Sequence, residues 1–472
     1  MRARRSLAAL AVVLVAGCAA GPDYVRPAVD TPTAWKVEAP WREARPSDAL
    51  PKGEWWKAFG DPELDALEAR ALAHNPTLAL ASARWAQARA SLSIASASLF
   101  PQLSLFNRDT RARGTENRPL SNYNSPNFST VQNDFVLSLT TSYELDLAGR
   151  VRRSVEGAQA TAERSAADFE NVRLLLTADL AVAYFGLRQV DAELDVLARA
   201  IAIQRRALEL VTARHDLGAA SGIDVAQQQA LIDNTLTQVE LLRRQRSQLQ
   251  NAIATLTGTP APVFEMAPRS RALVAPPVFP VGVPSDILER RPDVAAAERA
   301  MAAANAQIGV ARAALYPSIV IAGFYGAESR DLSTLFDAPS LVWSIGASLV
   351  QPIFDGGRIQ GNIAFTEAGY EAELAIYRRV VLNAMQEVQD GITGLSALER
   401  AHGQATAATV SAARVLDMAN TRYEGGAATY LEVITAQQFL LNTERLATQL
   451  QGQRLAASAA LAKSLGGGWE RN

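Results

Sequence analysis

The sequence predicts a mainly α-helical chain that carries four membrane β-strands and is built from two repeated halves. Three observations lead to this prediction: long heptad patterns, two stretches of alternating polarity, and self-similarity between the halves. The composition is compatible, because the 472 residues are 49% hydrophobic and the formal net charge is −2. Such a chain is too apolar for a disordered protein and too neutral for a strongly basic nucleic-acid binder. It has no repeated runs of about 20 apolar residues, which excludes a polytopic helical membrane protein.

The amino terminus has the pattern of a secretory signal that ends in a lipidation site. Three arginines within the first five residues precede an apolar stretch at 7–16, which is too short for a stable membrane span. The sequence Val-Ala-Gly-Cys follows, resembles a bacterial lipobox and ends in Cys18, the only cysteine of the chain. We therefore expect a signal peptide over residues 1–17, with S-diacylglycerol and N-acyl groups on Cys18. An ordinary signal with an incidental cysteine is the alternative, and Ala19 in place of an aspartate points to the outer membrane.

The mature chain contains an internal repeat. Residues 146–151 align with 354–359 at an offset of 208, and residues 75–78 align with 291–294 at an offset of 216. The first half therefore carries eight extra residues between the two aligned blocks. The predicted organisation is a lipidated N-terminus with the first repeat at 18–258, a Pro-rich connector at 259–284, and the second repeat with the C-terminal tail at 285–472.

The long helices are predicted to be coiled-coil-like. Apolar residues spaced three and four apart run from Leu180 to Val211, and a second such seam runs from Val225 to Leu256. Residues 150–213 are compatible with one helix of roughly 95 Å, at about 1.5 Å per residue. A stripe that packs on a globular core would usually end within about 20 residues. Hairpins of this length favour a rod or a tunnel.

Two short segments depart from the helical pattern and alternate in polarity. They predict strands at about 135–147 and 341–353, whose partners are expected at about 101–112 and 317–328. About ten alternating residues is the length that a tilted strand needs to cross a bilayer. Two soluble hairpins that cap a helical protein are the alternative. Four strands cannot close a membrane barrel, which needs about eight, so membrane strands require an oligomer.

Motifs distributed over the whole mature chain resemble one known family. They are Gly-Pro-Asp-Tyr-Val-Arg-Pro at 21–27, Trp-Trp-Lys-Ala-Phe-Gly-Asp-Pro-Glu-Leu at 55–64, Tyr-Glu-Leu-Asp-Leu-Ala-Gly-Arg at 143–150, Pro-Ser-Asp-Ile-Leu-Glu-Arg-Arg-Pro-Asp at 284–293 and Gly-Gly-Gly-Trp at 466–469. Together they resemble the TolC-type outer-membrane factor family, in particular the NodT or OprM-like lipoproteins that serve RND efflux systems.

This resemblance implies a fold, partners and a function. It implies a homotrimer with a twelve-stranded barrel, four strands from each chain, that continues into a periplasmic helical tunnel. The tunnel would meet a periplasmic adaptor protein coupled to an inner-membrane RND pump. The chain would then be a passive exit duct for drugs or other small toxic compounds, without a cofactor. The outer-membrane conduit of a type I protein secretion system is the alternative.

The turns between the long helices are the first candidate site. Gly218 and Gly426 are expected in the left-handed conformation that ends a helix, and Ser221 and Thr429 are expected to form capping boxes with acidic residues three positions on. The resemblance implies that these turns are tips that dock the adaptor, and turns that serve only to end one helix and cap the next are the alternative. The candidate docking residues are Arg214, Leu217, Gly218, Ser221, Arg422, Gly426 and Thr429.

The second candidate site is a periplasmic gate. In related channels the tunnel narrows before the tip through apolar and acidic rings, and Leu416 and Asn420 match such a constriction by position. Asn420 stands where the acidic residue is expected, so a carboxylate ring is in question. Asp417 is adjacent to Leu416 but lies about 100° around the helix from it. Solvated residues near a helix end are the alternative interpretation.

Catalytic signals are absent from the sequence. It contains no Walker loop, no Gly-x-Ser-x-Gly and no His-Glu-x-x-His, and its three histidines are scattered. One cysteine excludes a multi-cysteine metal site. We therefore expect no enzyme and no metal, and a purely structural coiled-coil lipoprotein remains the rival outside the transport class.

Overall fold

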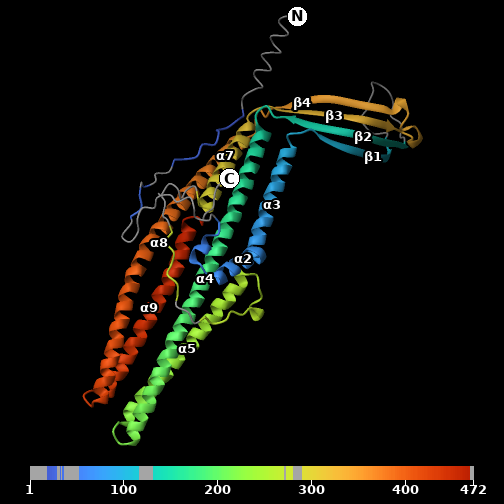
Figure 1. Cartoon of the computed structure of the whole chain (residues 1–472). Helices are drawn as coiled ribbons and strands as arrows, with labels where there is room; N and C mark the ends of the chain where they lie inside the picture. Colours follow the sequence, from blue (N-terminus) through green and yellow to red (C-terminus); the bar gives the residue numbers. More distant parts are fainter. Residues whose placement is uncertain are drawn as a thin grey trace. The chain divides into compact units, whose positions relative to one another are not determined.

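A computed structural model describes residues 19–28, 32, 34–36, 53–115, 131–269, 273–279 and 290–467. The predicted signal peptide and Cys18 lie outside the described residues. The chain divides into two compact units, each containing segments from both halves (Figure 1). The strand unit consists of Met1–Pro27, Trp85–Arg164 and Ala297–Tyr377, and the helical unit consists of Ala28–Arg84, Ser165–Ala296 and Arg378–Asn472.

The order of elements confirms the internal repeat. The first half contains η1 (Trp55–Phe59), α2 (Pro62–His74), α3 (Pro76–Ala97), β1 (Gln102–Arg113), β2 (Val131–Leu145), α4 (Arg150–Asp216), α5 (Gly222–Leu256) and η2 (Ala261–Val263). The second half contains α7 (Pro292–Ala313), β3 (Ser318–Ser329), η3 (Leu332–Thr334), η4 (Ala338–Ser340), β4 (Leu341–Val350), α8 (Arg358–Glu424) and α9 (Tyr430–Ser464). Corresponding helices have equal lengths: 22 residues in α3 and α7, 67 in α4 and α8, and 35 in α5 and α9.

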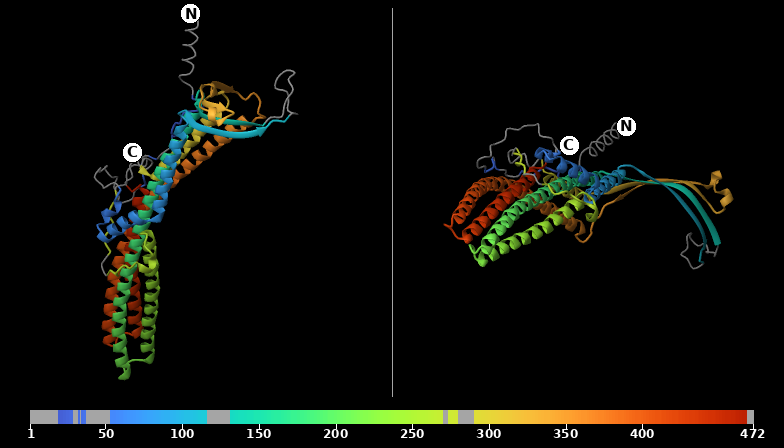
Figure 2. Two further views of the ribbon diagram at one scale, coloured as in Figure 1. Left: turned by 90° about the vertical axis from the view of Figure 1, so that its right-hand side faces the viewer. Right: turned by 60° about the horizontal axis from the view of Figure 1, so that its bottom comes forward.

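Within the described residues, the strand unit holds one antiparallel sheet in the order β1-β2-β3-β4. Strand β2 begins four residues before the predicted start, because its ladder with β1 continues as far as the pair Arg113 and Val131. The register places Leu105, Leu139, Tyr325 and Trp343 in one row across all four strands. The adjacent row, on the other face, contains Ser104, Thr140, Phe324 and Ser344. The sheet therefore has one largely apolar face and one more polar face, and it curves visibly in Figure 2.

An aspartate just before each of the two longest helices caps the first turn of that helix. Asp146 accepts hydrogen bonds from the amides of Val151 and Arg152, both at 2.9 Å. Asp355 accepts from the amides of Gly357 (3.0 Å) and Ile359 (2.9 Å). These carboxylates satisfy amides that have no partner within the helix. The gapless alignment had paired Asp146 with Phe354, so the two capping residues differ by one position.

The core of the helical unit joins η1 and α2 to the long helices. Figures 1 and 2 show α4, α5, α8 and α9 lying side by side in this unit. Trp55, Trp56 and Phe59 are buried, and the ring of Phe59 lies 4.7 Å from that of Phe185. Such aromatic contacts add to the gain from burying apolar area. The Trp-Trp motif therefore has a structural role: it packs η1, at the start of the first half, against α4.

Buried charges beside this core are paired. Tyr184 donates to Asp61 at 2.8 Å, and Arg269 contacts the same carboxylate at 3.0 Å. Burial acts to raise the pKa of Asp61, but the hydrogen bonds from Tyr184, from the Glu63 amide and from Arg269 outweigh it and leave the pKa below its ordinary value. On α4 and α5, Arg188 and Arg246 both contact Asp191, at 2.7 and 2.6 Å. The carboxylates of Asp61 and Asp191 therefore have partners, in contrast to one carboxyl nearby.

Glu68 on α2 is fully buried, and neither of its carboxyl oxygens has a hydrogen-bond partner among the described residues. Burial, with a smaller contribution from Asp65, raises the pKa of Glu68 to about 9. The folded protein therefore holds a proton on Glu68 at neutral pH that the unfolded chain releases near pH 4.5. The contribution of this group to stability is present in full below pH 4.5 and is lost as the pH rises toward 9.

Replacing Glu68 with methionine should remove this pH dependence. Between pH 6 and 8 the native protein should lose about 1.4 kcal/mol per pH unit from this group, and the variant should not. Denaturant unfolding followed by tryptophan fluorescence at both pH values would measure the difference, with Glu209→Met on an exposed position of α4 as the control. If the unfolding free energy of the native protein and that of Glu68→Met change equally with pH, the raised pKa of Glu68 is contradicted.

Candidate functional site

Two tight turns connect the long helices of the helical unit. In the turn from α4 to α5, Gly218 has a φ of 75°, its amide donates to the His215 carbonyl (2.8 Å), and the Ala219 amide donates to the Arg214 carbonyl (2.7 Å). The turn from α8 to α9 repeats this arrangement around Gly426, whose φ is 72°. Both turns are Schellman motifs, in which a left-handed residue lets two amides satisfy terminal carbonyls. The two predicted left-handed glycines are confirmed.

The helices that follow the turns begin differently. Ser221 accepts a hydrogen bond from the Ile223 amide, and Asp224 accepts from the Ser221 amide, which completes the predicted capping box of α5. The corresponding prediction for Thr429 is wrong, because its side chain makes no capping hydrogen bond. The second turn is tied instead by Arg422, whose guanidinium donates to the Ala427 carbonyl at 3.1 Å.

The tips are open to solvent in this chain. Leu217 is 84% exposed, and Ile223 and Leu431, which occupy matching positions in α5 and α9, are also exposed. A Cβ built on Gly218 or Gly426 would meet no atom within 4 Å. These leucine and isoleucine side chains offer apolar area to another molecule at both tips. The glycines would allow another backbone to approach closely.

A cation–π contact joins the two tips. The Arg214 guanidinium lies 4.8 Å from the centre of the Tyr423 ring and donates to the Tyr423 carbonyl at 3.5 Å. Tyr423 packs against Tyr430, whose hydroxyl donates to Gln228 at 3.0 Å. Burial raises the pKa of Tyr430 above its ordinary value, so its hydroxyl keeps the proton that it donates. Arg214 thus contacts the other tip.

Sequence reasoning missed Tyr423 as a member of this site. The only signal is an aromatic residue where the first half has His215, and that signal does not identify the partner in the other tip. Of the seven predicted docking residues, Arg214 alone makes such a contact between tips; the rest lie within their own turns.

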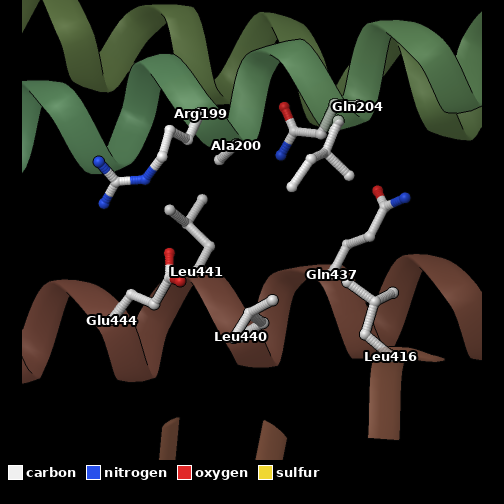
Figure 3. Close-up of a pocket in the computed structure, with 9 residues that line it drawn as sticks. Arg199, Ala200, Gln204, Leu416, Gln437, Leu440, Leu441 and Glu444 are labelled. Carbon is white, nitrogen blue, oxygen red and sulfur yellow. The ribbon is translucent and has the colours of Figure 1, made fainter. Parts of the chain in front are cut away.

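The predicted gate residues lie in different environments. Leu416 is 8% exposed and packs in an apolar cluster with Val211, Leu231 and Ile434. Asn420 is half-buried and Asp417 is exposed. In this single chain, Leu416 therefore packs α8 against neighbouring helices through the apolar cluster (Figure 3). That Leu416 and Asn420, four residues apart on one helical face, form a constriction stays a prediction.

The segment that follows Cys18 is bound within the strand unit. The Ala20 amide donates to the Ala148 carbonyl at 2.8 Å, and Arg153 contacts Asp23 at 2.7 Å. A Cβ on Gly21 would lie 2.6 Å from the Cα of Gly309, so the segment crosses α7 at a point where two glycines meet. The chain directly after Cys18 is thus fixed near the junction of β2 and α4.

Other candidate features are few. Within the described residues, no helix combines the length and the apolar character needed to cross a lipid bilayer. The same part of the chain contains no group of three or more His, Cys, Asp or Glu side chains able to hold a metal ion. The three histidines are separate, at the end of α2, at the first tip and in the middle of α8.

A four-stranded sheet with one apolar face, together with paired helical hairpins that end in exposed turns, defines an outer-membrane channel of the efflux type. The chain belongs to the outer membrane efflux protein family, which it matches over residues 67–259 and 283–467. These two ranges correspond to the two repeated halves. The resemblance to TolC-type channels is confirmed, and the chain is an outer-membrane efflux component.

Known relatives cover nearly the whole chain. The pyoverdine export outer membrane protein OpmQ of Pseudomonas aeruginosa is 32% identical over 460 residues, which cover 98% of this chain and 96% of that protein. The toluene efflux pump outer membrane protein TtgF of Pseudomonas putida is 31% identical over 467 residues, 97% and 95% of the two chains. The solved structure of the outer-membrane channel OprN aligns with a TM-score of 0.88 and 27% identity, covering 96% of this chain and all of that one.

Proposed function

We propose that this chain forms a homotrimer that serves as the passive exit duct of a tripartite efflux system, with a periplasmic adaptor and an inner-membrane RND pump. The observation that carries the proposal is the pair of exposed, glycine-centred tips. Names of relatives, such as those for pyoverdine export and toluene efflux, support small organic molecules as cargo. The duct performs no chemistry of its own, and no residue is assigned a catalytic role.

The sheet supports an oligomer. Among the described residues, β1 pairs only with β2 and β4 only with β3, so both outer strands keep a free edge. In a bilayer, unpaired backbone groups would cost several kcal/mol each, and closure with other copies removes them. Three chains would give twelve strands, which lies within the known range for membrane barrels. Two chains would give eight, so the number three comes from the family.

The tips support docking of the adaptor. The proposed contact residues are Arg214, Leu217, Gly218, Ser221, Arg422, Gly426 and Thr429. Leu217 offers the apolar contact, and the open space beside the two glycines would admit a partner backbone. Arg214 would act indirectly, by holding the first tip against Tyr423 of the second.

The amino-terminal segment supports a lipid anchor on Cys18. Its hydrogen bonds at Ala20 and Arg153 fix the chain close to the end of β2. If β2 crosses the outer membrane, Ala20 would lie near the membrane surface, and Cys18 precedes it in the sequence by two residues. Several acyl chains on one cysteine hold a protein far more firmly than one chain. Mass spectrometry of the mature protein would detect them, and Cys18→Ala should lack them.

A periplasmic gate would use the exposed side of α8. Because Leu416 is buried in its own chain, we assign the narrowing of the duct to Asn420 and Asp417, with Leu416 acting through helix packing. The carboxylate expected at the position of Asn420 would then come from the neighbouring Asp417.

A deletion strain tests the function. Loss of the chain should lower resistance to several small toxic compounds at least tenfold, and the plasmid-borne chain should restore it. Purified protein in planar bilayers should form cation- or anion-conducting channels, and adaptor should co-purify with it after cross-linking. Loss of an exported protein with unchanged drug resistance would point instead to a type I secretion conduit.

A further inference from the structure

The two β-hairpins of the strand unit have the same register. Strand β1 corresponds to β3 at the offset of 216, and β2 corresponds to β4 at the offset of 208. Shifting the pair Gln102 and Ser142 of the first hairpin by these offsets gives Ser318 and Val350, which are paired in the second hairpin. The two offsets therefore transfer strand pairing from one half of the chain to the other without a slip of one residue.

The two halves also meet each other within one chain. Strand β2 of the first half pairs with β3 of the second, with Leu139 opposite Tyr325. The adjoining helices continue this contact, because a Cβ built on Gly157 of α4 would lie 3.4 Å from the Cβ of Ala306 of α7. We call this contact of β2 and α4 with β3 and α7 the half-to-half junction.

The remaining ends of the two halves carry the same elements but lack the junction. Strand β4 corresponds to β2, and its outer edge is free among the described residues, as is that of β1. Phe365 of α8, which corresponds to Gly157, is 76% exposed. Ala90 and Ser91 of α3 are exposed, whereas Ala306, which corresponds to Ala90, is buried. A free strand edge beside an exposed phenylalanine is a surface suited to pairing with another chain.

We propose that a second copy of the chain completes the junction, so that β4 and α8 of one copy meet β1 and α3 of the next in the register of the half-to-half junction. This inference rests on the proposed homotrimer and adds which residues meet in it. The observed pair Leu139 and Tyr325 becomes Ala347 opposite Asp109 of the next copy. A register one residue away would place the apolar face of β4 beside the more polar face of β1, and the transferred register avoids this.

The transferred register also matches apolar residues at the helical ends of the strands. Leu145 of β2 is opposite Ile319 of β3 within the chain. The offsets turn this pair into Ile353, which follows β4, and Leu103 of β1 in the next copy. Both are strongly exposed in the single chain, Ile353 at 92%. The register therefore covers two apolar side chains that the chain itself leaves in the open.

Side-chain sizes along the helices are complementary in the same register. Within the chain, Gly157 of α4 faces the long side chain of Gln307 in α7, whose amide nitrogen would lie 3.3 Å from a Cβ on the glycine. The equivalent pair between copies is Phe365 of α8 and Ser91 of α3. The large and the small residue have exchanged helices, so the space beside α8 is filled by the phenylalanine of one copy against the serine of the next.

Paired cysteines test the strand register. Cys18 is the only native cysteine and is proposed to carry lipid, so introduced cysteines supply the free thiols. Directly opposite residues have Cα atoms about 4.5 or 5.5 Å apart in alternation, and both separations suit a disulfide. Oxidation of outer-membrane fractions should cross-link chains with Ala347→Cys and Asp109→Cys, or with Ser348→Cys and Arg108→Cys, into dimers and trimers that survive boiling without reductant.

Shifted pairs are the matched controls for the strands. Ala347→Cys combined with Asn107→Cys or with Arg111→Cys moves one thiol by two residues along the same face of β1. Diagonal neighbours of this kind lie about 7–8 Å apart, beyond the usual Cα separation of a disulfide. We expect at least tenfold less cross-linked product from either shifted pair than from Ala347→Cys with Asp109→Cys.

A helix pair tests the junction independently of the strands. Phe365→Cys with Ala90→Cys should cross-link between copies, because the equivalent Cβ atoms within the chain lie at disulfide distance. Phe365→Cys with Ala83→Cys, about 10 Å further along α3, should give at least tenfold less product. Unboiled gels before oxidation would verify that each variant assembles. Assembled oligomers that cross-link through the shifted pairs, or through none of the pairs, would overturn the register and leave the exit duct standing, whereas a native chain without oligomers would overturn both.

Discussion

Replacing Gly218 or Gly426 with tryptophan should reduce export to the level of a strain that lacks the channel. Each glycine lies at the exposed apex of a Schellman turn, and a side chain built there meets nothing in the same chain. A tryptophan would therefore project outward into the space that the adaptor is proposed to occupy. We expect at least a tenfold loss of resistance in either variant, with normal amounts of protein in the outer membrane.

Alanine at the same positions distinguishes two causes of lost export: a bulky side chain that blocks the adaptor, and strain in the turn backbone. Any residue with a Cβ at a φ near 75° costs about 1–2 kcal/mol, so Gly218→Ala and Gly218→Trp share this penalty. Only the tryptophan adds bulk. Resistance of the complemented deletion strain and cross-linking to the adaptor would be measured for both. If the alanine variants lose export as fully as the tryptophan variants, turn geometry and not docking explains the effect.

Much of the architecture could be predicted because it depends on local patterns. The heptad seams and alternating segments predicted the helices and strands. The offset of 208 predicted the separation between the starts of α4 and α8, and the offset of 216 that between α3 and α7. The left-handed conformation of Gly218 and Gly426 could be predicted, because a glycine directly after the end of a helix commonly adopts it. The capping box at Ser221 followed from the same local reasoning, and it failed at Thr429, where Arg422 supplies the stabilising bond of the turn.

Contacts between distant parts of the chain could not be predicted. Arg214 meets Tyr423 across 209 residues, and their contact depends on how two hairpins lie together. Leu416 illustrates the same limit. Its spacing from Asn420 placed both residues on one helical face, but the sequence did not show that the apolar cluster around Val211 and Ile434 buries Leu416. Local periodicity identifies a face of a helix, and only tertiary packing decides whether that face meets solvent, a lumen or another helix.

Arginine at Ile345 should prevent assembly of the channel, whereas arginine at Ser344 should not. Ile345 lies near the middle of β4, is 72% exposed, and shares the apolar face with Trp343 and Leu349. A cation on the lipid face of a barrel strand costs about 2–4 kcal/mol at the bilayer midplane. In a trimer the change occurs three times, so the total of about 6–12 kcal/mol is comparable with typical folding stabilities of about 5–15 kcal/mol.

Ser344 is the matched control, since it is the adjacent residue and is paired with Phe324 on the more polar face. An arginine there would face the water-filled interior of the proposed barrel, where a charge is tolerated and alters ion selectivity. Unboiled gel electrophoresis of outer-membrane fractions would measure the oligomer, with at least a tenfold loss expected for Ile345→Arg only. Planar bilayers should show Ser344→Arg channels shifted toward anions. Equal assembly of both variants would mean that the apolar face of the sheet does not meet lipid, and the free edges of β1 and β4 would then need another explanation than closure within a membrane.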